Sequence, residues 1–147
     1  MSTMISTLPI LVVEDNPHDV EIMVRALKRG QIRNELIIAR DGQEALDMLH
    51  TAVNPGLILL DLNLPRKNGH EVLQEIRIDP NLRRIPVIIL TASTREEDVV
   101  RSYDLGVNTF ISKPVEFDEF IRVVSSIGDY WIETATLPPP CNSAGDE

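Results

Sequence analysis

Five short apolar runs decide how this chain folds: 10–13 (ILVV), 36–38 (LII), 57–60 (LILL), 87–90 (VIIL) and 109–111 (TFI). They consist mainly of Leu and β-branched residues, and four of the five contain no polar residue at all. Apolar runs of this length without alternation are typical of strands that are buried on both faces. The runs therefore predict a sheet that is covered on both sides.

Stretches with helical spacing of apolar residues separate these runs. Asn16 can cap the first helix, Pro17 suits its first position, and Gly30 marks its end. Asp41 and Gly42 open the second helix. The third helix ends before Pro80. Its apolar residues are Val72, Leu73 and Ile76.

Two further helices follow in the second half of the chain. Residues 94–97 (TREE) resemble a capping box, which predicts that a fourth helix opens there and runs to Leu105 and Gly106. A fifth helix is indicated by an apolar stripe that consists of Phe117, Phe120, Ile121, Val124, Ile127 and Trp131.

Alternating strands and helices predict an α/β fold, a doubly wound five-stranded parallel sheet with right-handed crossovers. The chain has 147 residues, which is typical of one domain. We expect a mobile N-terminus at 1–7, one domain at 8–132, and a C-terminal extension and tail at 133–147, with no separate output domain. Ligands of such sheets bind beyond the carboxyl ends of the strands.

The composition narrows the possible partners and compartments. Fourteen Lys and Arg against twenty-three Asp and Glu give a net charge of −9, which disfavours binding to nucleic acids and anionic membranes. No apolar run is long enough to span a bilayer, and the first eight residues carry no Lys or Arg of a secretory signal. The single Cys141 fits a reducing compartment, so we expect a cytoplasmic protein.

Carboxylate, hydroxyl and amine side chains follow four of the predicted strands. Glu14 and Asp15 follow the first, Asp61 the third, Thr91 the fourth and Lys113 the fifth. Because these strand ends lie on one edge of a parallel sheet, we expect the side chains to converge. Converging carboxylates repel one another unless they bind a cation, and hard oxygen ligands favour Mg²⁺. The alternative is that Glu14 and Asp15 only cap the following helix.

This arrangement suits phosphoryl chemistry. A carboxylate such as Asp61 beside a divalent cation can act as a nucleophile toward phosphorus. Lys113 would neutralise the phosphoryl oxygens and the Thr91 hydroxyl would donate a hydrogen bond to them. Each residue also has a plainer interpretation, with Lys113 as a solvated lysine and Thr91 as an ordinary strand residue.

In this order, the residues resemble the receiver domain of two-component response regulators. The matching segments are 11–16 (LVVEDN), 59–69 (LLDLNLPRKNG), 89–92 (ILTA) and 113–114 (KP), and the likeness covers residues 8–132. The resemblance implies a flavodoxin-like (βα)5 fold with strand order 2-1-3-4-5. It also implies a phosphoacceptor switch, rather than an enzyme, that takes a phosphoryl group on Asp61 from a histidine kinase.

The resemblance also assigns roles within the site. Glu14, Asp15, Asp61 and the main-chain carbonyl of Asn63 would hold Mg²⁺, with Glu14 standing where many receivers have Asp. Thr91 and Lys113 would bind the phosphoryl group, and the Lys113–Pro114 peptide is commonly cis in this family. Thr91 and Phe110 would form the switch. Because Phe110 lacks the hydroxyl of the more frequent Tyr, its coupling would depend on packing alone.

Two segments narrow the resemblance further. Residues 61–69 and 130–138 resemble regulators that are paired with bacterial phytochromes, particularly cyanobacterial ones. This implies a light-regulated kinase partner and a homodimer formed through the face of strand five and the last helix. Tyr130, Trp131 and Leu137 could extend that interface, whereas the plainer alternative is that Trp131 covers its own core.

Two other functions stay open at this stage. A Mg²⁺-dependent phosphohydrolase would need a general acid two residues after its nucleophile, where this chain has Asn63. A flavodoxin-like electron carrier would need a Ser, Thr or Gly-rich phosphate loop in place of the acidic 14–17 segment. His18, His50 and His70 share no metal-ligand spacing and are interpreted as surface or helix-start residues.

Overall fold

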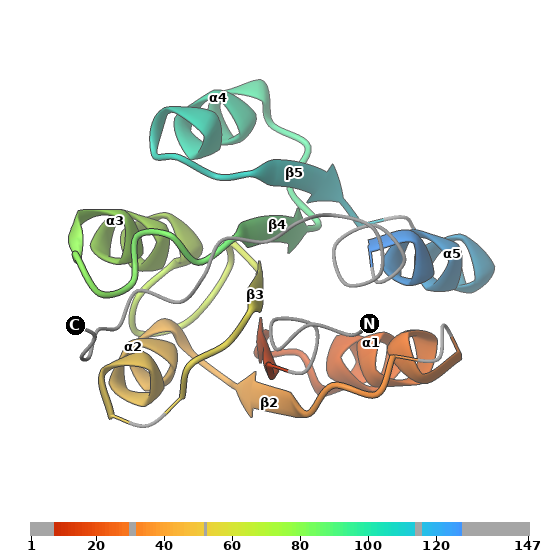
Figure 1. Cartoon of the computed structure of the whole chain (residues 1–147). Helices are drawn as coiled ribbons and strands as arrows, with labels where there is room; N and C mark the ends of the chain where they lie inside the picture. Colours follow the sequence, from red (N-terminus) through yellow and green to blue (C-terminus); the bar gives the residue numbers. More distant parts are fainter. Residues whose placement is uncertain (1–7, 30–31, 52, 114–115, 128–147) are drawn as a thin grey trace.

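The computed structural model describes residues 8–29, 32–51, 53–113 and 116–127. Strands and helices alternate along this part of the chain (Figure 1). The strands are β1 (Ile10–Val13), β2 (Leu36–Ala39), β3 (Leu57–Leu60), β4 (Val87–Thr91) and β5 (Thr109–Ser112). The helices are α1 (Pro17–Arg29), α2 (Gly42–Thr51), α3 (Gly69–Ile78), α4 (Glu96–Asp104) and α5 (Phe117–Ile127).

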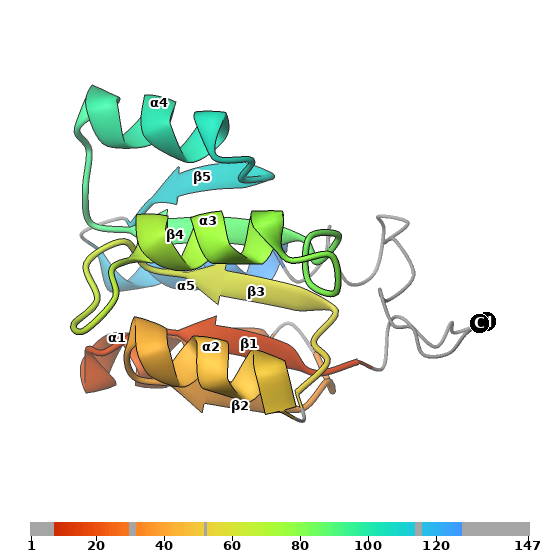
Figure 2. The same cartoon turned by 90° about the vertical axis from the view of Figure 1, so that its left-hand side faces the viewer.

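The strands form one parallel sheet in the order β2-β1-β3-β4-β5, which confirms the predicted fold class. Helices α1 and α5 lie on one face of the sheet, and α2, α3 and α4 lie on the other (Figures 1 and 2). The order reverses at β1, so the carboxyl ends of β1 and β3 lie side by side at a topological switch point.

Side-chain alternation along the strands divides the core into two layers. Ile10 and Val12 of β1 pack with α1 and α5, whereas Leu11 and Val13 pack with α2 and α3. The three inner strands are buried on both faces, as predicted. β2 is different, because residues 36–38 are only half-buried. The prediction of burial on both faces is wrong for β2, because this strand forms an edge of the sheet.

The openings of α3 and α4 differ in their chemistry. At α3 the Asn68 side chain accepts a hydrogen bond from the Glu71 amide, and Glu71 accepts one from the Asn68 amide, so this helix has a capping box. The capping box predicted for 94–97 is wrong, because the N-cap of α4 is Arg95 and makes no side-chain hydrogen bond. The Ser93 hydroxyl instead donates to Asp98 Oδ2 at 2.6 Å, which ties this turn together.

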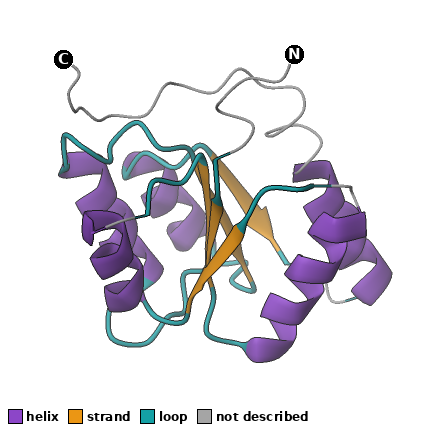
Figure 3. Cartoon of the chain, turned by 60° about the horizontal axis from the view of Figure 1, so that its bottom comes forward, coloured by secondary structure: helices purple, strands orange, loops and turns teal. Residues whose placement is uncertain are grey.

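The stripe on α5 is mostly confirmed. Phe120, Ile121, Val124 and Ile127 are buried. Phe117 is 40% exposed, and the Arg25 guanidinium lies 6.0 Å from its ring centre, so this end of the stripe lies at the surface. Figure 3 shows helices on both sides of the sheet.

Several predictions lie outside the described residues. They concern the helix stop at Gly30, the terminal segments 1–7 and 133–147, the single Cys141 and the interface residues Tyr130, Trp131 and Leu137. In the part of the chain that the structure describes, no helix has the length and apolar character required to cross a membrane.

Candidate functional site

The register of the sheet places two carboxylates side by side. Val13 of β1 pairs with Leu60 of β3, so Glu14 and Asp61 each follow a paired residue, and the Asp61 amide donates to the Val13 carbonyl at 3.1 Å. Val12 and Leu59 face α1 and α5. Because side chains alternate, Glu14 and Asp61 point toward that same side of the sheet.

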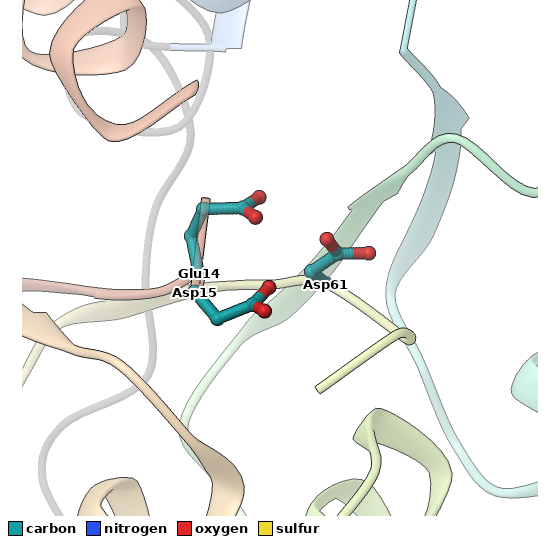
Figure 4. Close-up of side chains that lie close together, drawn as sticks. All are labelled: Glu14, Asp15 and Asp61. Atoms are coloured by element: carbon teal, nitrogen blue, oxygen red, sulfur yellow. The ribbon is translucent and has the colours of Figure 1, made fainter. Parts of the chain in front are cut away.

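Glu14, Asp15 and Asp61 form a cluster of oxygen ligands. One carboxylate oxygen from each residue lies within 4.8 Å of the others, and the three side chains face a common space in Figure 4. Glu14 is only 1% exposed and Asp61 5% exposed, whereas Asp15 is open to solvent. Closely spaced carboxylates with one open side suit a hard divalent cation that keeps part of its water shell.

The Lys113 ammonium group lies against this cluster. It donates to Glu14 Oε1 at 2.6 Å, to Asp19 Oδ2 at 2.7 Å and to Asp61 Oδ2 at 3.3 Å, and its side chain is 8% exposed. Its main-chain amide also donates to the Thr91 carbonyl at 2.7 Å, which fixes the start of this segment beside the end of β4. The predicted convergence of Lys113 with the carboxylates is what the structure shows.

Asp19 belongs to this site and sequence reasoning missed it. It lies in the first turn of α1 and its side chain is 21% exposed. A signal was available, because Asp19 follows Asp15 by four residues and the start of α1 lies directly after the end of β1. The contact with Lys113 spans 94 positions along the chain, so only the tertiary structure reveals it.

Burial shifts the titration of both partners in the central ion pair. Burial raises the pKa of Glu14 from 4.5 to about 7; the Lys113 hydrogen bond opposes this rise and the nearby Asp61 adds to it. Burial alone would lower the pKa of Lys113, but hydrogen bonds from its ammonium to Asp19 and Glu14 outweigh that effect and raise the pKa. Lys113 is therefore held as a cation within the carboxylate cluster.

The loop after Asp61 is held close to the site by α3. The Asn63 amide donates to Asp61 Oδ1 at 3.3 Å, and the Gly69 amide donates to the Leu62 carbonyl at 2.9 Å. A Cβ atom at Gly69 would lie 2.3 Å from the Asp61 carbonyl oxygen, so only glycine permits this approach. Asn63 itself is exposed.

Thr91 and Phe110 lie on the neighbouring strands. Thr91 is fully buried, and its hydroxyl accepts a hydrogen bond from the Ser93 amide at 3.4 Å. Phe110 pairs with Ile89, packs against the core layer of α2 and α3, and donates its amide to the Tyr103 hydroxyl at 3.2 Å. The predicted cis peptide after Lys113 involves a proline outside the described residues.

Of the two positions predicted for the histidines, surface or helix start, His70 occupies the second. It lies at the start of α3 and is 6% exposed, and its Nε2 atom lies 2.9 Å from the Ser102 hydroxyl of α4. Burial lowers its pKa, as does the nearby Arg101. His18 is exposed and His50 pairs with Asp79 at 3.1 Å. Within the described ranges, no histidine joins the metal-competent cluster.

A buried carboxylate with an ammonium partner and a cluster of oxygen ligands is suited to accept a phosphoryl group.

Known proteins are similar to this chain in sequence and in fold. The response regulator receiver domain family matches residues 10–125. Response regulator Rcp1 of Synechocystis sp. is 45% identical over 135 residues, which cover 88% of this chain and 92% of Rcp1.

Two solved structures are similar over nearly the same span. The phosphorylated cyanobacterial phytochrome response regulator RcpA superposes with a TM-score of 0.86 at 43% identity, covering 90% of this chain and 99% of RcpA. The Mn²⁺-bound form of Rcp1 superposes with a TM-score of 0.85 at 44% identity, again covering 90% and 99%.

Proposed function

Because the chain belongs to the family of response regulator receiver domains, we propose that its Asp61 accepts a phosphoryl group from a histidine kinase. One observation carries this proposal. The nearly buried Asp61 carboxylate shares a site with two further carboxylates and with the Lys113 ammonium at 3.3 Å. This is the electrostatic setting that an acyl phosphate requires, because each new phosphoryl oxygen needs a positive or hydrogen-bonding partner.

In the proposed reaction an Asp61 carboxylate oxygen attacks the phosphorus of a phosphohistidine. The new bond joins that oxygen to phosphorus, the bond from phosphorus to the imidazole nitrogen breaks, and the kinase histidine leaves. Lys113 compensates the charge on the transferred group, and the Thr91 hydroxyl, whose oxygen accepts from the Ser93 amide, donates its own hydrogen to that group. Asp61 is then an acyl phosphate.

We assign Glu14, Asp15, Asp61 and the Asn63 carbonyl to a Mg²⁺ site. Support comes from the oxygen cluster in this chain and from the Mn²⁺-bound structure of Rcp1. The bound ion would neutralise charge between the carboxylates and the incoming phosphoryl oxygens. Asp15 and Asn63 lie at the exposed side, where the donor and water can reach the site.

The proposed output is a change in partner affinity. A phosphoryl group on Asp61 would draw Thr91 toward it and alter the packing of Phe110 in β5. Such a population shift is limited by the energy difference between the two states. The protein would act as a phosphoacceptor switch with at most slow self-dephosphorylation.

The partners follow from the same subfamily. Because the similar protein RcpA is a cyanobacterial phytochrome response regulator, we propose a phytochrome-type sensor kinase as donor and a homodimer through the face of β5 and α5. Light scattering before and after phosphorylation tests the dimer. A mass that stays monomeric at micromolar concentration in both states excludes it.

The phosphoacceptor proposal is tested by incubating the protein with Mg²⁺ and a small acyl phosphate and recording the intact mass. Wild type should gain one phosphoryl group, and Asp61→Asn should gain none. Asp47→Asn is the matched control, since Asp47 is an exposed aspartate on α2. Labelling of Asp61→Asn at the wild-type level rejects the assignment. Multiple turnover of a phosphate ester would instead favour the phosphohydrolase alternative.

A further inference from the structure

Lys113 has three carboxylate partners, and one of them differs from the other two. Glu14 and Asp61 belong to the cluster of oxygen ligands, whereas Asp19 lies outside it. The Asp19 contact is nevertheless short, at 2.7 Å, compared with 2.6 Å for Glu14 and 3.3 Å for Asp61. The three hydrogens of the ammonium are therefore all used.

The oxygens of Glu14 and Asp61 are already engaged. Glu14 accepts Lys113 on Oε1 and the Asn16 amide on Oε2, and Asp61 accepts the Asn63 amide on Oδ1 and Lys113 on Oδ2. If Glu14 and Asp61 also bind a divalent cation, they must share their carboxylate oxygens between the cation and the Lys113 ammonium. Asp19 has no such second task, so its bond to the ammonium does not compete with cation binding.

The cap and the packing of α1 fix the position of Asp19. Its amide donates to Asn16 Oδ1 at 3.3 Å within the cap of α1, and its carboxylate lies in the first turn of that helix. A carboxylate is favoured there by the exposed amides of the helix N-terminus. α1 itself is anchored, because it packs against α5 and the sheet through Ile22, Met23 and Ala26.

We propose that Asp19 is a positioning residue for phosphoryl transfer, which holds the Lys113 ammonium beside Asp61 when Glu14 and Asp61 bind a divalent cation. The inference rests on the proposed function and deepens it. An ammonium that is fixed before the reaction does not have to be ordered during it, and small displacements of such groups slow enzymatic reactions strongly.

The test uses Asp19→Asn in the full chain, with the phosphorylation rate measured at saturating Mg²⁺ and acyl phosphate. We expect the rate to fall about tenfold, because a neutral amide holds an ammonium less firmly than a carboxylate. Asp19→Glu should recover part of the rate. Glu21→Gln is the matched control, since it removes the same charge from the same helix but Glu21 pairs with Arg25 and not with Lys113.

A second readout follows Lys113 itself. In the Mg²⁺-loaded, unphosphorylated protein, the ammonium of isotope-labelled Lys113 should give a protected proton resonance, assigned by its loss in Lys113→Arg. This resonance should persist in Glu21→Gln and disappear through solvent exchange in Asp19→Asn. A residue that merely stabilised the fold would lower the melting temperature and leave the resonance in place.

The outcomes separate the two proposals. If wild type takes up phosphate on Asp61 and Asp19→Asn does so at the same saturated rate, the role of Asp19 is rejected and the proposed function stands. The role of Asp19 is also rejected if Asp19→Asn lowers only the affinity for Mg²⁺ and leaves the saturated phosphorylation rate unchanged, since Asp19 would then act through its charge alone. If wild type takes up no phosphate, the proposed function itself fails.

Discussion

Lys113 shows how individual residues define this site. Its side chain is almost fully buried, although a lone lysine avoids such a position, because carboxylates from three different segments surround its ammonium. Removing the ammonium leaves carboxylates in a buried site without their cation. The positive charge therefore stabilises the metal-free protein as well as serving the proposed chemistry.

We predict that Lys113→Met lowers the unfolding free energy of the metal-free protein by about 3 kcal/mol, as expected for removing one partner of a buried charge cluster. Mg²⁺ should recover part of this loss, because it replaces the missing positive charge. Lys67→Met is the control, since Lys67 forms a half-exposed pair with Glu75. Denaturant titrations with and without Mg²⁺ give both values, and equal losses in the two variants would contradict the prediction.

The residues of the site were predictable to different degrees. Glu14, Asp61 and Lys113 follow directly after recognisable strands, so the edge of a parallel sheet brings them together whatever the details of packing. Asp19 and His70 depend on how helices lie against their neighbours. The contact of His70 with Ser102 leaves no local pattern in the sequence, and the only sign of the contact between Asp19 and Lys113 is that Asp19 follows Asp15 by four residues.

Helix ends show the same contrast at the scale of elements. The sequence signals at 68–71 and 94–97 look alike, yet only the first forms a capping box. At α4 the turn is instead closed by Ser93 and Asp98, and α4 is joined to α3 by Ser102 and His70. Competing hydrogen bonds of short polar side chains decide which pattern forms.

Asn68→Ala should lower the unfolding free energy by about 1 kcal/mol, because the Glu71 amide loses its capping partner. Thr94→Ala should have little effect, since its side chain is exposed and the residue is not the N-cap of α4. Thermal or chemical denaturation of the two variants compares these caps directly. An equal cost would show that Thr94 caps α4 in solution.

The contact between α3 and α4 should depend on pH through His70. Burial and Arg101 lower its pKa, an effect that Asp98 opposes. The unfolded imidazole takes up a proton near pH 6.5, and the folded one only at lower pH. Its contribution to stability is therefore complete above pH 6.5 and is lost as the pH falls toward the folded pKa.

We predict that wild type is more stable than His70→Gln at pH 7.5 and that this difference shrinks at pH 5.5. Melting temperatures at the two pH values measure it. His18→Gln serves as the matched control for removing an exposed imidazole from the same chain. If the difference between wild type and His70→Gln grows at pH 5.5, the prediction is wrong.

Strand positions were predicted better than strand environments. β1, β3 and β4 are apolar on both faces and lie inside the sheet, as their sequences indicate. β2 has the same apolar character, but its place at the edge leaves residues 36–38 half-buried. Whether a strand lies at an edge depends on strand order, which only the resemblance to receiver domains supplied.

For the whole molecule, the fold gathers charged residues from β1, α1, β3 and β5 at one edge of the sheet. Helices lie on both faces of the sheet (Figure 3), and the exposed Asp15 and Asn63 give solvent access to the site. A ligand that binds there contacts several elements at once, so its binding energy stabilises the entire domain.

Mg²⁺ should therefore raise the melting temperature of wild type, and chelation should reverse the effect. At about one hundred times its dissociation constant, Mg²⁺ should add about 2.7 kcal/mol to the unfolding free energy. Glu14→Gln should respond much less, because it loses one charged ligand, while Glu21→Gln should respond like wild type. Calorimetric titration gives the affinities, and unchanged Mg²⁺ binding in Glu14→Gln would exclude Glu14 from the metal site.

The most direct test of the central claim is to locate the phosphoryl group. The protein is incubated with Mg²⁺ and a small acyl phosphate, the acyl phosphate is reduced with borohydride, and the peptides are sequenced by mass spectrometry. Reduction converts a phosphorylated aspartate to homoserine, and we predict this conversion at Asp61 alone and only when Mg²⁺ is present. Homoserine at another aspartate with Asp61 intact would contradict the proposal.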